Sequence, residues 1–351
     1  MRRSLLILTL LFTCLIAEAM TSRTRLLMGT YATITLPKEE NRFISDLFDY
    51  IAKIERSLST FDPNASLYKL NQNHTISYDP ILSNALTSAK EYFRQTDGYF
   101  DVTIGSITKR LYRFGEVSPG SPTHTALQKA IRNIDGFHID TEGINSDKGI
   151  VIDLGSMGKG YAVDHAALLL VKRGIHRGII ALSGDIRCLH RCSLGIQSPF
   201  DENALLATLT AKVENLSVST SGTYRRYATK RSEHHLIDPK TARQGDAFVS
   251  VTLLAKADNT RIDAYATAIS VMPEDRAVVF LEGQKDIGYI IVRSDGKILT
   301  GNTENLVAIT WLNTQSDHQS IPSNITKRST KRIEKRGLST PAASRPINAG
   351  R

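Results

Sequence analysis

The segment from Val151 to Gly174 places the strongest constraint on how this chain folds. It opens with an apolar run that contains Asp153, continues through Gly155, Gly158 and Gly160, and ends in helically spaced apolar residues, namely Ala162, Val163, Ala166, Ala167 and Leu170. We expect a strand, a glycine turn and a helix, an order that brings backbone N–H groups at the helix start close to a phosphate. Lys159 would add positive charge there. A tight turn with a solvated lysine explains the same residues.

A second helical pattern, from Arg261 to Met272, places two oxygen ligands on one face. Asp263 and Thr267 are four residues apart, a spacing that puts their side chains one above the other on a helix. A carboxylate and a hydroxyl are hard donors of the kind that bind Mg²⁺ together with substrate phosphates. The alternative is an ordinary packed helix, in which Asp and Thr bond to nearby backbone.

The other apolar patterns mix helices and strands without a regular strand–helix–strand repeat. Helical spacing covers 43–58, 81–93 and a shorter helix that opens at Thr123, with Leu127 and Ile131 on its buried side. Strands are predicted at 26–36, 175–182, 194–196, 205–209, 216–218, 249–254, 287–292 and 307–311. This order favours an α+β architecture, and 351 residues permit a single domain of two intermixed lobes.

Both ends of the chain have the composition of segments outside a folded core. Residues 1–19 combine early arginines, an apolar run and the sequence Ala17-Glu18-Ala19, which predicts a signal peptide. We therefore expect an exported protein in the periplasm, and lipidation of Cys14 is the alternative that would attach it to the inner membrane. Residues 314–351 are rich in Ser, Thr, Asn and Pro and predict a basic disordered tail.

The net charge of +9 comes from these two ends. Residues 314–351 contribute a net charge of +6 and residues 1–25 a net charge of +3, so residues 26–313 are neutral overall. The basic pI therefore gives no reason to expect a nucleic-acid partner for the folded part. The tail either contacts an anionic membrane surface or is simply solvated.

Two further cysteines, Cys188 and Cys192, follow each other closely across a predicted hairpin. In an exported protein this spacing suits a disulfide better than a metal site, because no second pair of soft ligands lies nearby in sequence. Two unpaired thiols remain an equal alternative.

Eight short motifs follow one another between Leu26 and Asn313. They are Met28-Gly29-Thr30, Ser59-Thr60-Phe61, Asp97 to Gly105, Asp153 to Gly160, Ser183-Gly184-Asp185, Ser219 to Gly222, His234 to Pro239, and Asp263 to Thr267. In this order they resemble the ApbE family of flavin transferases. The resemblance implies an ApbE-type, T-fold-like catalytic domain over residues 26–313. It also implies an enzyme that attaches FMN from FAD to a Thr or Ser of a partner protein through a phosphoester bond and releases AMP.

The resemblance further implies roles for individual residues. Mg²⁺ would be held by Asp263, Thr267 and the backbone carbonyl of Ser156. The contacts to FAD would come from Met28, Phe61, Tyr99, Phe100, Asp101, Asp153, Lys159, His235 and Ile237, with Phe61 against the flavin ring. Catalysis would depend on Asp263 and on the positive charge of Lys159. His235 is the first candidate for the proton acceptor, since a neutral imidazole takes up a proton near pH 7.

At several positions near the implied site the chain departs from the usual family residues. Val102 and Ser106 replace prolines, Ser183 replaces the first glycine of a pair, Ala242 replaces a glycine after the Asp-Pro motif, and Phe61 replaces a tyrosine. None of these changes removes a metal ligand. We therefore expect activity to persist in a pocket whose backbone is slightly altered.

Two other functions fit the same motifs. One is a nonenzymatic FAD-binding protein, and the other is a Mg²⁺-dependent pyrophosphatase that cleaves FAD into FMN and AMP. For the transferase, analogy points to an acceptor in a membrane flavin redox complex, such as a subunit of a sodium-pumping NADH:quinone oxidoreductase.

Overall fold

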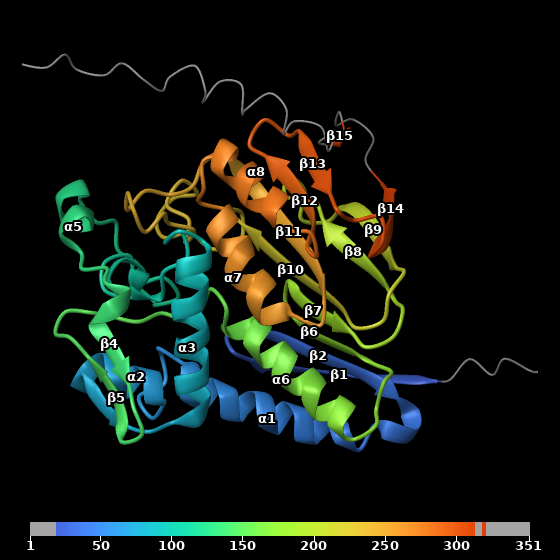
Figure 1. Cartoon of the computed structure of the whole chain (residues 1–351), viewed down its shortest axis with the longest axis horizontal. Helices are drawn as coiled ribbons and strands as arrows, with labels where there is room; N and C mark the ends of the chain where they lie inside the picture. Colours follow the sequence, from blue (N-terminus) through green and yellow to red (C-terminus); the bar gives the residue numbers. More distant parts are fainter. Residues whose placement is uncertain (1–18, 313–317, 321–351) are drawn as a thin grey trace, which may run out of the picture.

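A nine-stranded sheet forms the centre of the computed structural model, which describes residues 19–312 and 318–320 (Figure 1). The spatial order is β1 (Met20–Leu27), β2 (Thr30–Pro37), β6 (Ile179–Leu182), β7 (Asp185–Cys188), β10 (Leu216–Gly222), β11 (Phe248–Lys256), β12 (Gly288–Arg293), β13 (Ile298–Gly301) and β15 (His318–Ser320). Neighbouring strands are antiparallel except for β13 and β15. The predicted α+β class is therefore confirmed.

The two faces of this sheet are covered differently (Figure 1). Helices α1 (Phe43–Leu58), α6 (Gly158–Lys172), α7 (Asn259–Ile269) and α8 (Glu274–Gly283) pack on one face, and a small sheet of β8 (Ser193–Gln197), β9 (Leu205–Ala211) and β14 (Val307–Trp311) packs on the other. On β12, Ile291 joins the core under the helices, whereas Ile290 and Val292 join the core under the small sheet. Successive side chains of a strand point to opposite faces, so one strand serves both cores.

The remaining elements lie beside the sheet (Figure 1). They are the helices α2 (Ser66–Asn73), α3 (Pro80–Gln95), α4 (Gly105–Thr108) and α5 (His124–Lys129), a sheet of β3 (Thr75–Ser77), β5 (Gly143–Ser146) and β4 (Phe137–Ile139), and single 3₁₀ turns at Lys38–Glu40, Val102–Ile104 and Ile134–Gly136. Because α1 and α3 share the core under the helices with α6 and α7, this part is continuous with the rest of the fold.

The helical predictions agree best with the structure where the pattern is long. The predicted helix 43–58 has the bounds of α1, and α6 and α7 follow where the glycine segment and the Asp263 segment place them. The interpretation of Ile131 was wrong, because α5 ends at Lys129 and Ile131 is 48% exposed. The sequence patterns did not indicate α2 or α8, which are short and carry few buried residues.

Two strand predictions were also wrong. The predicted strand 26–36 is a hairpin, with Met28 and Gly29 at positive φ in a two-residue turn between β1 and β2. Residues 151–154 are not a strand. There the side chain of Asn71 bonds to both the N–H and the carbonyl of Ile152 at 2.8 Å, replacing a neighbouring strand.

Further predictions from the sequence concern the cysteines and the two ends of the chain. Cys188 and Cys192 form a disulfide, with their Cα atoms 6.2 Å apart. Of the described strands, β1 begins at Met20, before residue 26, and β15 lies within the range 314–351. Residues 1–18, including Cys14, and the rest of the predicted tail lie outside the described residues. In the described ranges, no helix has both the length and the apolar character needed to cross a membrane.

Candidate active site

A cavity of about 1020 Å³ contains the whole predicted site. All twelve residues inferred from the sequence line it, namely Met28, Phe61, Tyr99, Phe100, Asp101, Asp153, Ser156, Lys159, His235, Ile237, Asp263 and Thr267. Its walls come from the β1–β2 turn, the glycine turn, α7 and the loop of residues 223–247, which we call the β10–β11 loop. The volume lies at the upper end for small-molecule sites and suits a dinucleotide.

The three proposed metal ligands meet where the start of α6 contacts α7. The Thr267 hydroxyl donates to the carbonyl of Ser156 at 3.3 Å, and the backbone N–H of Gly160 donates to Asp263 Oδ2 at 3.0 Å. A Cβ at Gly160 would lie 2.4 Å from the carbonyl oxygen of Asn259 and 2.8 Å from the Cβ of Asp263. Glycine at this position therefore permits the close approach that gathers the three oxygen ligands.

Lys159 lies between two buried carboxylates. Its Nζ is 2.8 Å from Asp185 Oδ2 and 3.5 Å from Asp263 Oδ2. Burial raises the pKa of Asp263, and repulsion from Asp185 raises it further against the attraction of Lys159. Burial favours the neutral form of Lys159, but the two carboxylates outweigh it and raise the pKa of the ammonium. Two carboxylates share one cation here, so a bound metal ion would neutralise the remaining negative charge.

The chemistry of the donors fits Mg²⁺. One carboxylate, one hydroxyl and one backbone carbonyl are hard oxygen ligands, and Mg²⁺ commonly takes only a few protein ligands beside substrate phosphates. Across residues 19–312 and 318–320, no group of three or more His, Cys, Asp or Glu could hold a metal ion. The chain thus offers a site with few protein ligands that substrate oxygens would complete.

Asp153 is held at the glycine turn through both carboxylate oxygens. Oδ1 accepts the backbone N–H of Gly155 at 3.0 Å, and Oδ2 accepts the Thr108 hydroxyl at 2.7 Å. The ammonium of Lys109 is 3.7 Å from Oδ2. Burial opposes ionisation, but Lys109 and these hydrogen bonds prevail and lower the pKa of Asp153. Asp153 is therefore an ionised, well-oriented acceptor for ligand hydroxyls or amines.

A lysine ammonium lies over one ring face of Phe61 and another over one ring face of Tyr99. Lys109 Nζ lies 4.1 Å from the centroid of Phe61, and Lys240 Nζ lies 4.2 Å from that of Tyr99. Phe61 is 50% exposed. A flavin ring that stacks on Phe61 must therefore use the opposite face or displace Lys109.

Phe100 and Asp101 line the cavity, but their side chains are engaged elsewhere. Phe100 is 1% exposed and meets Tyr92 edge-on with a centroid separation of 6.1 Å, so no ring face is free for stacking. Asp101 Oδ1 accepts the backbone N–H and the hydroxyl of Thr103 at 2.8 and 2.7 Å. Burial raises the pKa of Asp101 against these bonds. The motif correctly indicated the location of this pair and could not indicate how their side chains point.

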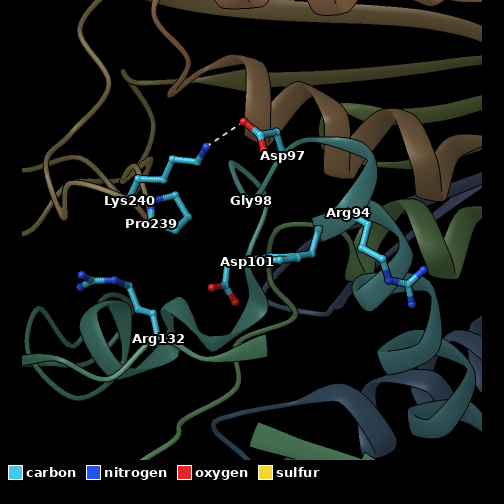
Figure 2. Close-up of a pocket in the computed structure, with 8 residues that line it drawn as sticks. Arg94, Asp97, Gly98, Asp101, Arg132, Pro239 and Lys240 are labelled. Atoms are coloured by element: carbon cyan, nitrogen blue, oxygen red, sulfur yellow. Dashed lines mark hydrogen bonds and ion pairs between the residues drawn. The ribbon is translucent and has the colours of Figure 1, made fainter. Parts of the chain in front are cut away.

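A smaller cavity of about 490 Å³ adjoins the first, and Asp101 and Pro239 line both. Figure 2 shows Asp101 and Arg132 on one side of it and the ion pair of Lys240 with Asp97, at 3.0 Å, on the other. Arg94 points away from the other labelled side chains (Figure 2). None of the proposed metal ligands reaches this smaller cavity.

His235 differs from the sequence-based expectation of a base that titrates near pH 7. Its Nδ1 lies 3.1 Å from the carbonyl oxygen of Arg226, which can only accept, so Nδ1 carries the hydrogen and Nε2 is the acceptor. Burial, and then the positive charge of Arg226, lower the pKa of His235 to about 3. The ring is neutral at pH 7 but is a weak base until a negative ligand raises its pKa.

Met28 and Ile237 contribute through backbone geometry and packing. The N–H of Met28 donates to Glu55 Oε1 at 2.8 Å, which fixes the β1–β2 turn at the cavity. Ile237 is 5% exposed and belongs to a small core with Tyr112 and Phe114. Both residues therefore shape the cavity wall more than they supply polar contacts.

Comparison with known proteins agrees with this arrangement. The model of the ApbE family matches residues 28–291, a range that includes every predicted site residue. The chain belongs to the ApbE family.

Individual members of the family give the same result. The FAD:protein FMN transferase of Vibrio cholerae is 30% identical over 280 residues, covering 74% of this chain and 80% of that protein. The one from Escherichia coli K12 is 28% identical over 284 residues, covering 73% and 80%. The solved ApbE protein of Thermotoga maritima has a TM-score of 0.73 at 22% identity, covering 81% of this chain and 98% of that one. The predicted ApbE-type fold is therefore confirmed, and this chain, like its relatives, is a transferase.

Three residues of this ApbE site were not assigned a role from the sequence. Asp185 pairs with Lys159, Lys109 lies beside both Asp153 and Phe61, and Arg226 lies close enough to influence the pKa of His235. Asp185 belongs to the Ser183-Gly184-Asp185 motif and could have been found there. Lys109 and Arg226 carry no comparable sequence pattern.

Proposed function

We propose that this ApbE-family protein is a Mg²⁺-dependent FAD:protein FMN transferase that attaches FMN to a Thr or Ser of an acceptor protein and releases AMP. One observation carries the proposal: Ser156, Asp263 and Thr267 meet beside Lys159 at one end of a cavity large enough for a dinucleotide. The names of the relatives from Vibrio cholerae and Escherichia coli support the same reaction.

In this reaction, the acceptor hydroxyl oxygen forms a bond to the phosphorus on the FMN side of FAD. The bond between that phosphorus and the bridging oxygen breaks, and the bridging oxygen leaves with AMP. Asp263, Thr267 and the Ser156 carbonyl would hold Mg²⁺, which when bound supplies positive charge to the pyrophosphate. Catalysis of this kind consists mainly of positioning and neutralisation of charge.

Other side chains of the cavity bind FAD, neutralise its charge and accept the proton. Lys159 neutralises phosphate charge, and the ionised Asp153 accepts hydrogen bonds from FAD. Phe61 and Tyr99 offer rings to the ligand. His235 Nε2 accepts the proton of the attacking hydroxyl, because the negative charge of bound FAD raises the pKa of the imidazole from its low value in the free protein.

The test is an incubation of the full chain with FAD, Mg²⁺ and a domain that carries an acceptor threonine, followed by intact mass and nucleotide analysis. We expect the acceptor to gain the mass of FMN less water, with an equal amount of AMP. Free FMN and AMP with an unmodified acceptor would identify a pyrophosphatase instead. Unchanged FAD that stays bound would identify a carrier.

The proposed setting follows from the sequence of residues 1–19. An exported enzyme would act in the periplasm or at the surface of the inner membrane, where an acceptor subunit of a membrane flavin redox complex is accessible. Mature protein recovered from a periplasmic extract, with an N-terminus at residue 20, would support this location. Recovery of the full-length chain in the cytoplasm would contradict it.

A further inference from the structure

We infer that Asp164 is a positioning residue: through α6, it fixes the start of α7 and so sets where Asp263 and Thr267 lie relative to Ser156. Asp164 lies on α6, but its side chain does not line the cavity. The inference rests on the proposed Mg²⁺ site, because it concerns how the ligands of that site are held in place.

The carboxylate of Asp164 receives the first backbone N–H groups of α7. Oδ1 accepts the N–H of Asn259 at 2.9 Å, and Oδ2 accepts the N–H of Thr260 at 2.7 Å and its hydroxyl at 2.5 Å. The first N–H groups of a helix have no partner within that helix. Among the backbone N–H groups of α7, the side chain of Asp258 accepts only the later one of Arg261, at 3.3 Å. The first turn of α7 is therefore held largely by a side chain of another helix.

Asp164 is itself oriented by Arg187 of β7. The guanidinium donates to Asp164 Oδ1 through Nη2, and its Nε donates to the Asn259 side chain at 3.0 Å and to Ser217 Oγ at 2.9 Å. Arg187 is 5% exposed. A buried guanidinium whose Nε and Nη2 are both hydrogen-bonded has fixed directions for these bonds, so it leaves Asp164 little freedom to turn.

The same strand also holds the catalytic end of α6. Asp185 and Arg187 are two residues apart on β7, so their side chains lie on the same face. Asp185 pairs with Lys159, and Arg187 pairs with Asp164. Two ion pairs of opposite polarity therefore connect β7 to α6, one inside the cavity and one behind it.

A consequence for the metal ligands follows from helix geometry. Asp263 and Thr267 lie one and two turns beyond the first residues of α7, so any displacement of that first turn is passed to both. Gly160 supplies one contact between α6 and α7, at Asp263. The bonds of Asp164 to Asn259 and Thr260 join the same two helices at a second place, the first turn of α7.

The test uses two mild variants, Asp164→Glu and Thr260→Val, in the full chain. Asp164→Glu keeps a negative charge beside Arg187 but moves the carboxylate by one methylene. Thr260→Val keeps the side-chain shape and loses one hydrogen bond to Asp164. The readouts are the affinity for Mn²⁺ without FAD, followed by electron paramagnetic resonance, the values of kcat and KM for transfer, and the melting temperature. Mn²⁺ is a suitable probe because it accepts the same oxygen ligands.

We expect Asp164→Glu to weaken Mn²⁺ binding about tenfold, as is typical when a residue that orients a metal ligand is changed. Its kcat should fall by a similar factor, while KM for the acceptor stays within about twofold, because no residue of the first turn of α7 lines the cavity. Thr260→Val should weaken Mn²⁺ binding about threefold, since one of several hydrogen bonds is lost. The matched control is Ile298→Ala, in the core under the small sheet, where the side chain is 1% exposed. It should lower the melting temperature and leave Mn²⁺ binding unchanged.

The inference is overturned if both variants lower the melting temperature as Ile298→Ala does but bind Mn²⁺ within twofold of the unmodified protein. Failure of the proposed function looks different. In that case the unmodified protein binds no Mn²⁺ either with or without FAD, or Asp263→Asn binds it equally well, and both proposals fall together. Where Asp263→Asn loses Mn²⁺ and the unmodified protein binds it, the site stands and the two mild variants alone decide the role of Asp164.

Discussion

The two sides of the large cavity are built in different ways. One side, which we call the metal side, carries the proposed ligands Ser156, Asp263 and Thr267 and consists of α6, α7 and β7. Its polar groups have buried partners, as the 1% exposure of Asp185 and the 5% exposure of Arg187 illustrate. The opposite side is the β10–β11 loop, which pairs through isolated bridges such as that of Tyr227 with His234. Tyr227 itself is 44% exposed.

This difference matches the tasks that the two sides would perform. Groups that neutralise developing charge must be held within a fraction of an ångström, which regular elements with buried hydrogen bonds achieve. A large ligand and a protein acceptor must also enter, and surface loops on a rigid scaffold provide for that. We therefore expect changes to the metal ligands to reduce the rate of transfer most, whereas the loop side should determine how stability responds to pH.

The largest effect is expected for Asp263→Asn. Loss of the only proposed carboxylate ligand should lower the rate of FMN transfer at least about a thousandfold, since a bound metal contributes several kcal/mol to such reactions. The melting temperature should stay the same or rise, because the variant removes one of two carboxylates that share Lys159. Mass spectrometry of the acceptor and a thermal melt measure both.

The control for Asp263→Asn is Asp286→Asn. Asp286 pairs with Arg261 of α7 outside the cavity, and its side chain is 63% exposed. It should retain nearly full activity. Transfer by Asp263→Asn at more than a tenth of the normal rate would contradict the assignment of chemistry to the metal side.

Next in size is Gly160→Ala, which tests how closely α6 and α7 must approach. The added Cβ would lie 2.4 Å from the carbonyl oxygen of Asn259, so one helix must move. We expect a loss of about 1–3 kcal/mol in the free energy of unfolding, measured in urea, together with weaker Mn²⁺ binding. Gly283→Ala is the matched control, because a Cβ at Gly283 meets nothing within 4 Å. Equal stability of the two variants would contradict the close approach.

The metal side was also the part more readily predicted from the sequence. Asp263 and Thr267 share a helix, and Ser156 and Lys159 share one glycine turn, so local spacing was enough to suggest each half of the site. The ordered motifs then joined the halves. Residue types and their order therefore indicated where the twelve site residues would lie, and the structure places all of them around one cavity.

What the sequence could not supply are contacts between distant elements. Asp164 and Arg187 are ordinary charged residues in the sequence, and only the packing of α6 on β7 brings them together. The direction of the Phe100 ring and the low pKa of His235 likewise depend on neighbours from other segments. The hairpin at Met28 was missed because apolar residues on both sides of the turn look like one continuous strand.

The pH dependence of the free energy of unfolding should depend on His235, in the β10–β11 loop. The pKa of His235 is lowered from 6.5 to about 3 in the folded protein. Between these values His235 binds a proton in the unfolded chain but not in the folded protein, so the contribution of His235 to stability falls as pH drops below about 6.5 and levels off near pH 3, while the raised pKa of Asp263 acts in the opposite direction. The slope is at most about 1.4 kcal/mol per pH unit, and partial exposure of the ring reduces it.

Urea unfolding at pH 7, 6 and 5 measures this slope. His235→Gln should flatten it, and saturating FAD should do the same in the unmodified protein, because negative phosphates raise the pKa of the imidazole. His138→Gln, at an exposed position on β4, is the control and should change nothing. An unaltered slope in His235→Gln would mean that other residues cause the loss of stability in acid. The loop side would then not differ from the metal side in its pH response.

The smallest effect is expected from replacing one residue at positive φ on each side with glycine. The residues are Ser183, in the β6–β7 turn that leads to Asp185, and Ala242, in the β10–β11 loop. Their φ values are 56° and 58°, a conformation that costs a residue other than glycine about 1–2 kcal/mol. Glycine removes this cost but adds about 0.4–1 kcal/mol of freedom to the unfolded chain. Ser183 is exposed, so Ser183→Gly should stabilise the protein by about 0.5 kcal/mol in urea unfolding. Ala242 is 2% exposed and Ala242→Gly also loses a buried methyl, about 0.8 kcal/mol, so its net gain should vanish. Equal gains at both positions would show that the loop side is packed less closely around Ala242 than its burial indicates.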